Sequence, residues 1–212
     1  MQSLYQQLLK APQNAPVFLS DELEKESLIE AYKFGLFPWT NAPVSWWCPN
    51  PRMVLLPSEI YKQKSTMRFY NRYEIRLDSA FTPLMRLCAS ARAKSWIDEG
   101  FIAVYSELFK EGIAHSVEIY DNDTLVGGLY GLIIGKMFFG ESMVSTAKNA
   151  SKVAMIKLCE LLAPYNFLID CQIYNPHLAF MGAKNIPRAE FLHILEQKVS
   201  QKSGFDEFKA LL

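Results

Sequence analysis

The stretch 138–172 contains three short segments that decide the fold: FFGESM at 138–143, NASK at 149–152 and LIDCQ at 168–172. The first and third lie in apolar runs of strand length, so we predict strands over 136–143 and 167–173. Between them, apolar residues recur with helical spacing over 150–162, which predicts a helix. The order strand, helix, strand is therefore the centre from which the rest of the fold is built.

The segments around this centre predict an α+β protein. A hairpin is expected from 114–120 and 124–134, and a strand at 73–77. Helices are expected at 20–35 (capped by Ser20 or Asp21 and stopped by Gly35), 65–73 (with Arg68 and Arg72 on one face), 82–92, 102–111 and 188–199. Region 37–52 carries four prolines and three tryptophans, which predict an ordered, packed loop. We expect a small N-terminal domain (1–52) and a larger domain (53–212) with a mostly antiparallel sheet flanked by helices.

Polar residues interrupt two of the apolar strands. Side chains alternate along a strand, so Asp170 and Gln172 should point the same way and Cys171 the other way. Burying such polar groups is costly unless they are hydrogen-bonded. Glu141 follows Gly140, which lets a backbone or a ligand come close. An acid bonded to backbone amides at a strand end would explain any one of these residues, but the three together favour a reaction centre.

The composition excludes several classes of protein. Half of the 212 residues are hydrophobic and 13% are aromatic, enough for a sizeable core. No apolar stretch reaches the roughly 20 residues of a membrane span, and the first residues lack the features of a secretory signal. The four scattered cysteines are typical of reduced thiols in a cytosol. We therefore expect a cytoplasmic protein, acting as a monomer and without a membrane partner.

Charge is distributed unevenly although the net charge is zero. Between residues 62 and 94 there are eight basic residues against two acids. A local basic patch on a neutral protein fits a partner held at one place by its phosphates. A solvated helix face of mixed charge is the alternative. The residues that we assign to nucleic-acid contact are Lys62, Lys64, Arg68 and Arg72.

Other chemistries have little support in the sequence. The nucleotide-binding patterns G-x-x-x-x-G-K-[ST] and G-x-G-x-x-G are missing, and loop 142–152 has no glycine, unlike the pyrophosphate loops of acetyl-CoA enzymes. Ser145 and Lys148 match S-x-x-K without its companion motifs, and a helix cap at Asn149 or Ser151 explains this region better. The three histidines are scattered, so we expect no metal, and His115 should be a hydrogen-bonded core residue.

Nine segments in order resemble one enzyme family. They are LIEAYKFGLFPW (28–39), WWCPNPR (46–52), SWI (95–97), AHSVEIY (114–120), LVGGLYG (125–131), FFGESM (138–143), NASK (149–152), LIDCQ (168–172) and MGAKNIPR (181–188). Each motif is weak alone, but the ordered set is specific, and it resembles the leucyl/phenylalanyl-tRNA–protein transferases. The resemblance implies an acetyltransferase-like (GNAT-like) larger domain. It also implies an aminoacyltransferase that moves Leu or Phe, less often Met, from aminoacyl-tRNA to proteins with N-terminal Arg or Lys, marking them for degradation.

The same resemblance implies roles for individual residues. Asp170, orienting Gln172, would position the acceptor amine, and Glu141 would pair with the cationic side chain of the acceptor's first residue. The donor side chain would enter an apolar slot lined by Trp39, Trp96, Leu129, Phe138, Met155, Leu158 and Ile169. No cofactor is expected, because an aminoacyl ester is already activated. Two alternatives remain: a non-catalytic module that recognises basic N-terminal residues, and an acyl-CoA acyltransferase.

Overall fold

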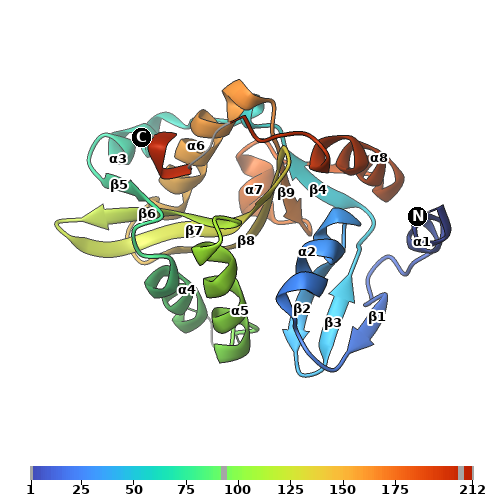
Figure 1. Ribbon diagram of the computed structural model, residues 1–212. Coiled ribbons are helices and arrows are strands. Elements are labelled where there is room, and N and C mark those ends of the chain that lie inside the picture. Colours follow the sequence, from blue (N-terminus) through green and yellow to red (C-terminus); the bar gives the residue numbers. More distant parts are fainter. Residues whose placement is uncertain (1, 92–94, 205–207, 212) are drawn as a thin grey trace.

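The computed structural model describes residues 2–91, 95–204 and 208–211 (Figure 1). Arg92 and Lys94, which belong to the basic segment, lie outside these ranges. The described residues form an α+β structure with two sheets. The smaller sheet has the order β1-β3-β2 and contains β1 (Phe18–Ser20), β2 (Phe37–Asn41) and β3 (Val44–Trp47).

The larger sheet has seven strands in the order β10-β4-β9-β8-β7-β6-β5. Its strands are β4 (Arg52–Leu55), β5 (Glu74–Leu77), β6 (Ala114–Asp121), β7 (Thr124–Ile134), β8 (Met137–Ser145), β9 (Leu168–Gln172) and β10 (Lys184–Ile186). The α-helices are α1 (Gln2–Leu9), α2 (Lys25–Lys33), α3 (Lys64–Tyr70), α4 (Phe81–Ser90), α5 (Glu99–Lys110), α6 (Ala150–Leu162), α7 (Pro176–Phe180) and α8 (Arg188–Val199). The 3₁₀ helices within the described ranges are η1 (Pro57–Glu59), η2 (Ala163–Tyr165) and η3 (Phe208–Leu211).

Several predicted elements are confirmed, and others need correction at their ends. The hairpin β6–β7 and the helices α6 and α8 lie where the sequence patterns place them. The first predicted helix starts later than expected: α2 begins after Glu24 rather than at Ser20 or Asp21. Helix α3 ends at Tyr70, so Arg72 lies beyond the helix and does not share a face of it with Arg68.

Region 37–52 is not the packed loop that its prolines suggested. It forms the hairpin β2–β3 and leads into β4. Proline excludes a helix but is tolerated in edge strands and turns, where no backbone N–H is needed. Pro38 lies in β2, an edge strand of the smaller sheet, and Pro43 lies in the turn to β3. The density of prolines therefore hides two strands from a reading of the sequence.

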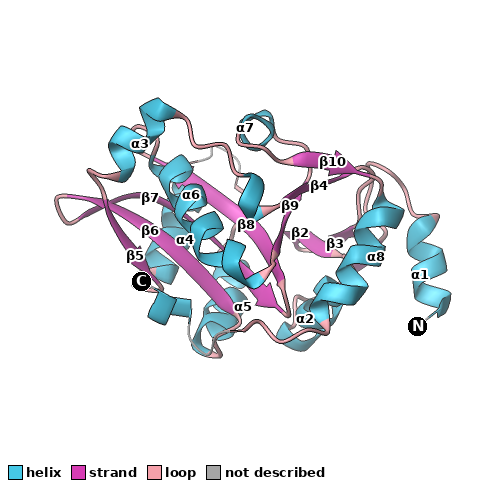
Figure 2. Cartoon of the chain, turned by 90° about the horizontal axis from the view of Figure 1, so that it is seen from above, coloured by secondary structure: helices cyan, strands magenta, loops and turns pink. Residues whose placement is uncertain are grey.

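The larger sheet is antiparallel except for one pair of strands. β8 and β9 run parallel, with Phe138 opposite Ile169 and Phe139 opposite Asp170. Parallel neighbours need a crossover, and α6 supplies it. Helices α3 and α6 cover one face of the sheet, and α4 and α5 cover the other (Figures 1 and 2). The paired positions end at Phe139, so the residues that follow Gly140 on β8 no longer face a partner on β9.

The smaller sheet is held against the larger one by buried contacts. The side chain of Arg188, at the start of α8, donates hydrogen bonds to the carbonyl oxygens of Cys48, Ala11 and Pro12. Helix α2 packs on both α5 and α8, and Gly35 lies directly against Leu192. These contacts fix β2 beside the point where β8 and β9 separate.

Candidate active site

A pocket of about 330 Å³ lies where β8 and β9 separate. Its walls come from β2, β7, β8, β9, α6 and α7. The structure brings most of the predicted site residues together there: Glu141, Asp170 and Gln172, with Trp39, Trp96, Leu129, Phe138, Met155 and Ile169. A polar group and an apolar slot therefore share one cavity, as expected for a site that binds a side chain beside a reacting atom.

Leu158 is the exception among the predicted slot residues. Its side chain is fully buried in the core and does not line the pocket. On α6, Met155 reaches the pocket, whereas Leu158 packs into the apolar cluster between the helix and the sheet. Helical spacing puts both residues on one side of the helix, but it does not say which of them borders a cavity. Conversely, the pocket includes Tyr174, Asn175 and Leu178, which the sequence analysis did not assign.

Asp170 forms a buried ion pair with Arg52. Nε and Nη2 of Arg52 donate to the two carboxylate oxygens at 2.8 and 2.6 Å, and both side chains are 0% exposed. The guanidinium also lies over the rings of Phe37 and Phe191, 4.8 and 4.5 Å from their centroids. Burial opposes the charge on Arg52, but the adjacent carboxylate raises the pKa of the guanidinium above its ordinary value. The charge of Asp170 is thus neutralised inside the protein.

Gln172 departs from regular strand geometry. Its φ is 63°, and the pairing of β9 with β4 shifts register at this position. Its backbone N–H donates to Oδ1 of Asp170 at 2.9 Å, and its side-chain Nε2 donates to Oε1 of Glu141 at 3.2 Å. Strict alternation therefore does not hold here, and Cys171, predicted on the other face, also borders the pocket. Asp170 therefore contacts Gln172 through the backbone N–H of that residue.

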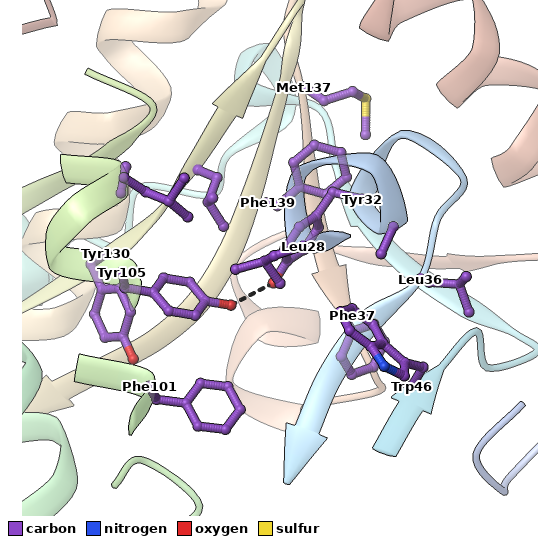
Figure 3. Packing of buried hydrophobic residues seen from close by; sticks show 14 of the residues in the cluster. Leu28, Tyr32, Leu36, Phe37, Trp46, Phe101, Tyr105, Tyr130, Met137 and Phe139 are labelled. Carbon is purple, nitrogen blue, oxygen red and sulfur yellow. Dashed lines mark hydrogen bonds between the residues drawn. The ribbon is translucent and has the colours of Figure 1, made fainter. Parts of the chain in front are cut away.

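Glu141 is buried among hydrogen-bond donors. Tyr32 and Tyr105 donate to its two oxygens at 2.5 and 3.0 Å. The two tyrosine hydroxyls also lie 2.8 Å apart, and Figure 3 shows this contact between α2 and α5. Burial raises the pKa of Glu141 to about 7, against the effect of the tyrosine hydrogen bonds, which lower it. Within the described ranges no cationic side chain forms an ion pair with this carboxylate, although the charge of Arg52 lowers its pKa slightly against the effect of burial.

Three residues of this polar network are not predicted from the sequence: Arg52, Tyr32 and Tyr105. Tyr32 and Tyr105 lie on the apolar faces of α2 and α5, where a tyrosine hydroxyl must find a partner. That requirement was a usable signal. Arg52 stands 118 residues from Asp170, and nothing in local spacing links them.

The predicted tRNA-contact residues lie outside the pocket and differ in their partners. Lys62 forms an ion pair with Glu160 at 2.6 Å, and Arg72 forms one with Asp121 at 2.8 Å. Lys64 and Arg68 have no ion-pair partner among the described residues. Of the four predicted tRNA-contact residues, two are therefore neutralised by acids, and Lys64 and Arg68 are not paired with an acid within the described part of the chain.

The remaining candidates have structural explanations. His115 is buried, and its ring nitrogens lie 2.8 Å from Asp78 and 3.0 Å from the Gly112 carbonyl, which confirms a hydrogen-bonded core residue. Ser145 accepts a hydrogen bond from the backbone N–H of Ser151 and so caps the start of α6. Neither Asn149 nor Ser151, the predicted caps, makes a side-chain capping bond there.

Within residues 2–91, 95–204 and 208–211, no group of three or more His, Cys, Asp or Glu residues could hold a metal. In the same ranges no helix has the length and apolar character to cross a membrane.

Comparison with known proteins identifies the family. The family model described as leucyl/phenylalanyl-tRNA protein transferase matches residues 54–196, and the model of the N-terminal domain of these proteins matches residues 21–50. The chain belongs to the leucyl/phenylalanyl-tRNA–protein transferase family. The expected aminoacyltransferase class of enzyme is thereby confirmed.

Individual transferases of this family are similar over nearly the whole chain. The leucyl/phenylalanyl-tRNA–protein transferase of Campylobacter jejuni subsp. jejuni serotype O:23/36 (strain 81-176) is 60% identical over 210 residues, covering 99% of this chain and 98% of the relative. That of Thiobacillus denitrificans (strain ATCC 25259 / T1) is 47% identical over 195 residues, covering 88% and 86%. A solved structure of a functionally unknown conserved protein from Staphylococcus epidermidis ATCC 12228 aligns over 80% of this chain and 66% of its own, with 11% identity and a TM-score of 0.40. This last likeness is too weak to assign a fold.

Proposed function

We propose that this transferase moves Leu or Phe, and less often Met, from aminoacyl-tRNA to the α-amine of proteins whose first residue is Arg or Lys, marking them for degradation. The supporting observation is Glu141, a buried carboxylate that borders the pocket without a cationic partner among the described residues. A guanidinium or ammonium group from the acceptor would neutralise it through charge-assisted hydrogen bonds. The name of the family, leucyl/phenylalanyl-tRNA protein transferase, supports Leu and Phe on tRNA as the donors.

In this proposal Gln172 contacts the acceptor amine. Its Nε2 is held by Glu141, which leaves the amide oxygen free to accept a hydrogen bond from the α-amine. The amine nitrogen attacks the ester carbonyl of the aminoacyl group and forms an amide bond. The bond from the carbonyl carbon to the ribose oxygen breaks, and the proton lost by the amine is returned to that oxygen. Holding the two substrates together can lower such a barrier by roughly 7–11 kcal/mol.

Asp170 takes a positioning role rather than direct contact with the amine. Its carboxylate is fully buried and paired with Arg52, and it reaches the pocket chemistry through the backbone N–H of Gln172.

The apolar slot separates the two functional hypotheses. A module that only recognises basic N-terminal residues needs Glu141 but has no use for the apolar slot beside it.

The assay that tests the proposal offers the protein labelled Leu-tRNA or Phe-tRNA together with a peptide that begins with Arg. Label should appear in the peptide. A matched peptide that begins with Ala should receive little label, because it cannot neutralise Glu141. If no label enters the Arg peptide at any salt concentration or pH, while the peptide binds, the recognition module replaces the transferase. A shift of the melting temperature by coenzyme A would favour the acyl-CoA alternative.

The apolar slot predicts loose selection among donors. Shape discriminates weakly, at about 1–3 kcal/mol per methylene, so Leu, Phe and Met should all transfer. Val and Ile should be excluded sterically, because their side chains branch at Cβ. Substituting Leu129→Phe narrows the slot and should lower kcat/KM for Phe-tRNA more than for Leu-tRNA. Leu158→Met is the matched control, because Leu158 does not border the pocket, and it should leave the ratio unchanged. Efficient transfer of Val would show that the slot is assigned wrongly.

The basic segment predicts a graded dependence of tRNA binding on salt. Each phosphate contact contributes about 0.7–0.9 to the log–log salt slope. The double variant Lys64→Ala/Arg68→Ala should lower the magnitude of that slope by about 1.4–1.8. Lys62→Ala/Arg72→Ala should lower it less, since Glu160 and Asp121 already hold these cations. Measuring the affinity for tRNA from 50 to 300 mM salt tests this prediction. If both variants keep the wild-type slope, the basic segment is ordinary solvated surface and does not contact tRNA.

We also infer an acetyltransferase-like arrangement for the larger domain. It is supported by a run of antiparallel strands followed by the parallel pair β8–β9 with α6 between them. The strands separate after Phe139, and the pocket occupies the space between them. Since the loop before α6 contains no glycine, we expect this arrangement to bind an aminoacyl ester rather than a pyrophosphate.

A further inference from the structure

Two half-exposed aromatic rings lie together on the surface beside the pocket. Tyr61 and Phe180 are 54% and 51% exposed, and their ring centroids lie 5.7 Å apart in an edge-to-face arrangement. The ammonium of Lys152, on α6, lies 5.4 Å from the centre of the Phe180 ring. We call Tyr61, Phe180 and Lys152 the aromatic platform. Neither ring is needed by the core, and neither has a role in the transfer chemistry described above.

The platform is held in place by the backbone around it. The N–H of Tyr61 donates to the carbonyl oxygen of Met181 at 2.9 Å, which ties the segment after η1 to the end of α7. A Cβ at Gly182 would lie only 2.7 Å from the carbonyl oxygen of Glu59, so these two segments touch. The rings are therefore presented on fixed elements and not on a loose loop.

The segments that carry the platform also carry residues of the pocket and of the basic segment. Phe180 ends α7, the helix whose Leu178 lines the pocket. Lys152 stands one helical turn before Met155, another pocket residue, on α6. On the other side, Tyr61 directly precedes Lys62, the first residue of the basic segment. A chain that enters the pocket with one end and reaches the basic segment with its phosphates would pass over these rings.

We propose that the aromatic platform binds the unpaired 3′ nucleotides of aminoacyl-tRNA, with bases stacked on Tyr61 and Phe180 and a phosphate near Lys152. This rests on the proposed function, which places the esterified 3′ end in the pocket. Aromatic rings beside cations are the usual means of holding single-stranded nucleic acid, because every base has a face that can stack. The neighbouring cations Lys64 and Lys152 favour a nucleic acid over the acceptor protein. The acids Glu160 and Glu59 are already paired with Lys62 and Lys184.

The experiment compares tRNA binding by wild type and by Tyr61→Ala/Phe180→Ala. Loss of stacking should weaken binding of full-length tRNA by about 5- to 100-fold. A tRNA trimmed of its unpaired 3′ nucleotides should bind the variant and the wild type equally. A 2-aminopurine base placed next to the terminal adenosine should lose fluorescence on binding to wild type, through stacking, and not on binding to the variant. Tyr61→Phe/Phe180→Tyr keeps both rings and should behave as wild type. Phe18→Ala removes an exposed aromatic ring from β1 and should have no effect.

A minimal donor separates failure of the platform from failure of the proposed function. Leu or Phe esterified to a single adenosine lacks the preceding nucleotides that the platform is proposed to hold, so its kcat/KM should be unchanged in the alanine variant. If this donor and full-length tRNA both give no transfer with wild type, the proposed function fails, while the fluorescence of bound tRNA still decides on the platform. Equal loss of affinity for trimmed and full-length tRNA, or no loss for either, would overturn the platform. Weakened acceptor binding with unchanged tRNA affinity would assign the rings to the acceptor protein instead.

Discussion

Replacing Asp170 by alanine should lower the free energy of unfolding by about 3–5 kcal/mol. The substitution leaves the Arg52 guanidinium buried, at 0% exposure, without its counter-charge, and it removes the acceptor of the Gln172 backbone N–H. The effect on stability and the effect on the site are coupled, because the same carboxylate pairs with Arg52 and accepts the hydrogen bond of Gln172. Denaturant unfolding at pH 7 measures the loss.

A second variant separates the two roles of Asp170. Exchanging the pair for apolar residues of similar volume, Arg52→Met/Asp170→Leu, should restore most of the lost stability, yet transfer should remain impaired since Gln172 is no longer held. Asp121→Ala is the matched control. It breaks an exposed Asp–Arg pair and should cost no more than about 1 kcal/mol. An Asp170→Ala protein as stable as wild type would contradict the role given to the ion pair.

The elements that the sequence predicts well are those fixed by local patterns. Helix α6 follows a stripe of apolar residues, and the hairpin β6–β7 follows two runs of strand length joined at Asp121–Asp123. Periodicity of this kind depends only on neighbours within a few residues, so it can be read directly from the chain. The other site residues were predicted from the family motifs. Glu141, Asp170 and Gln172, which these motifs contain, line one pocket.

What the sequence could not supply depends on contacts between distant residues. The partner of Asp170 lies on β4, and those of Glu141 lie on α2 and α5. Only the folded sheet and the helices packed on it bring these elements together. The choice between Met155 and Leu158 as a pocket residue is of the same kind, because it depends on where β8 and β9 separate. The strands β2 and β3 were hidden by prolines whose positions in an edge strand and a turn become evident only from the pairing.

Acceptor binding should weaken as the pH falls through about 7, the value to which burial raises the pKa of Glu141. Above that pH the carboxylate is charged and attracts a guanidinium; below it the protonated acid does not. The dissociation constant should rise by up to about tenfold per pH unit on the acid side, as for loss of one ionised group. A peptide with an N-terminal arginine whose α-amino group is replaced by hydrogen measures this, because it cannot react and its own amine does not titrate.

Glu141→Gln supplies the control for that titration. The variant should bind the same peptide about 10- to 100-fold more weakly at pH 8, through loss of charge-assisted contacts, and its affinity should not change with pH.

The ionisation of Glu141 that favours acceptor binding should lower the free energy of unfolding. The folded protein holds the proton of Glu141 more tightly than the unfolded chain, so this contribution is complete below pH about 4.5 and is lost as the pH rises to about 7. At pH 8 the glutamine variant should therefore be more stable than wild type, by up to about 3 kcal/mol. A pH-independent acceptor affinity in the wild type would mean that Glu141 does not bind the basic side chain.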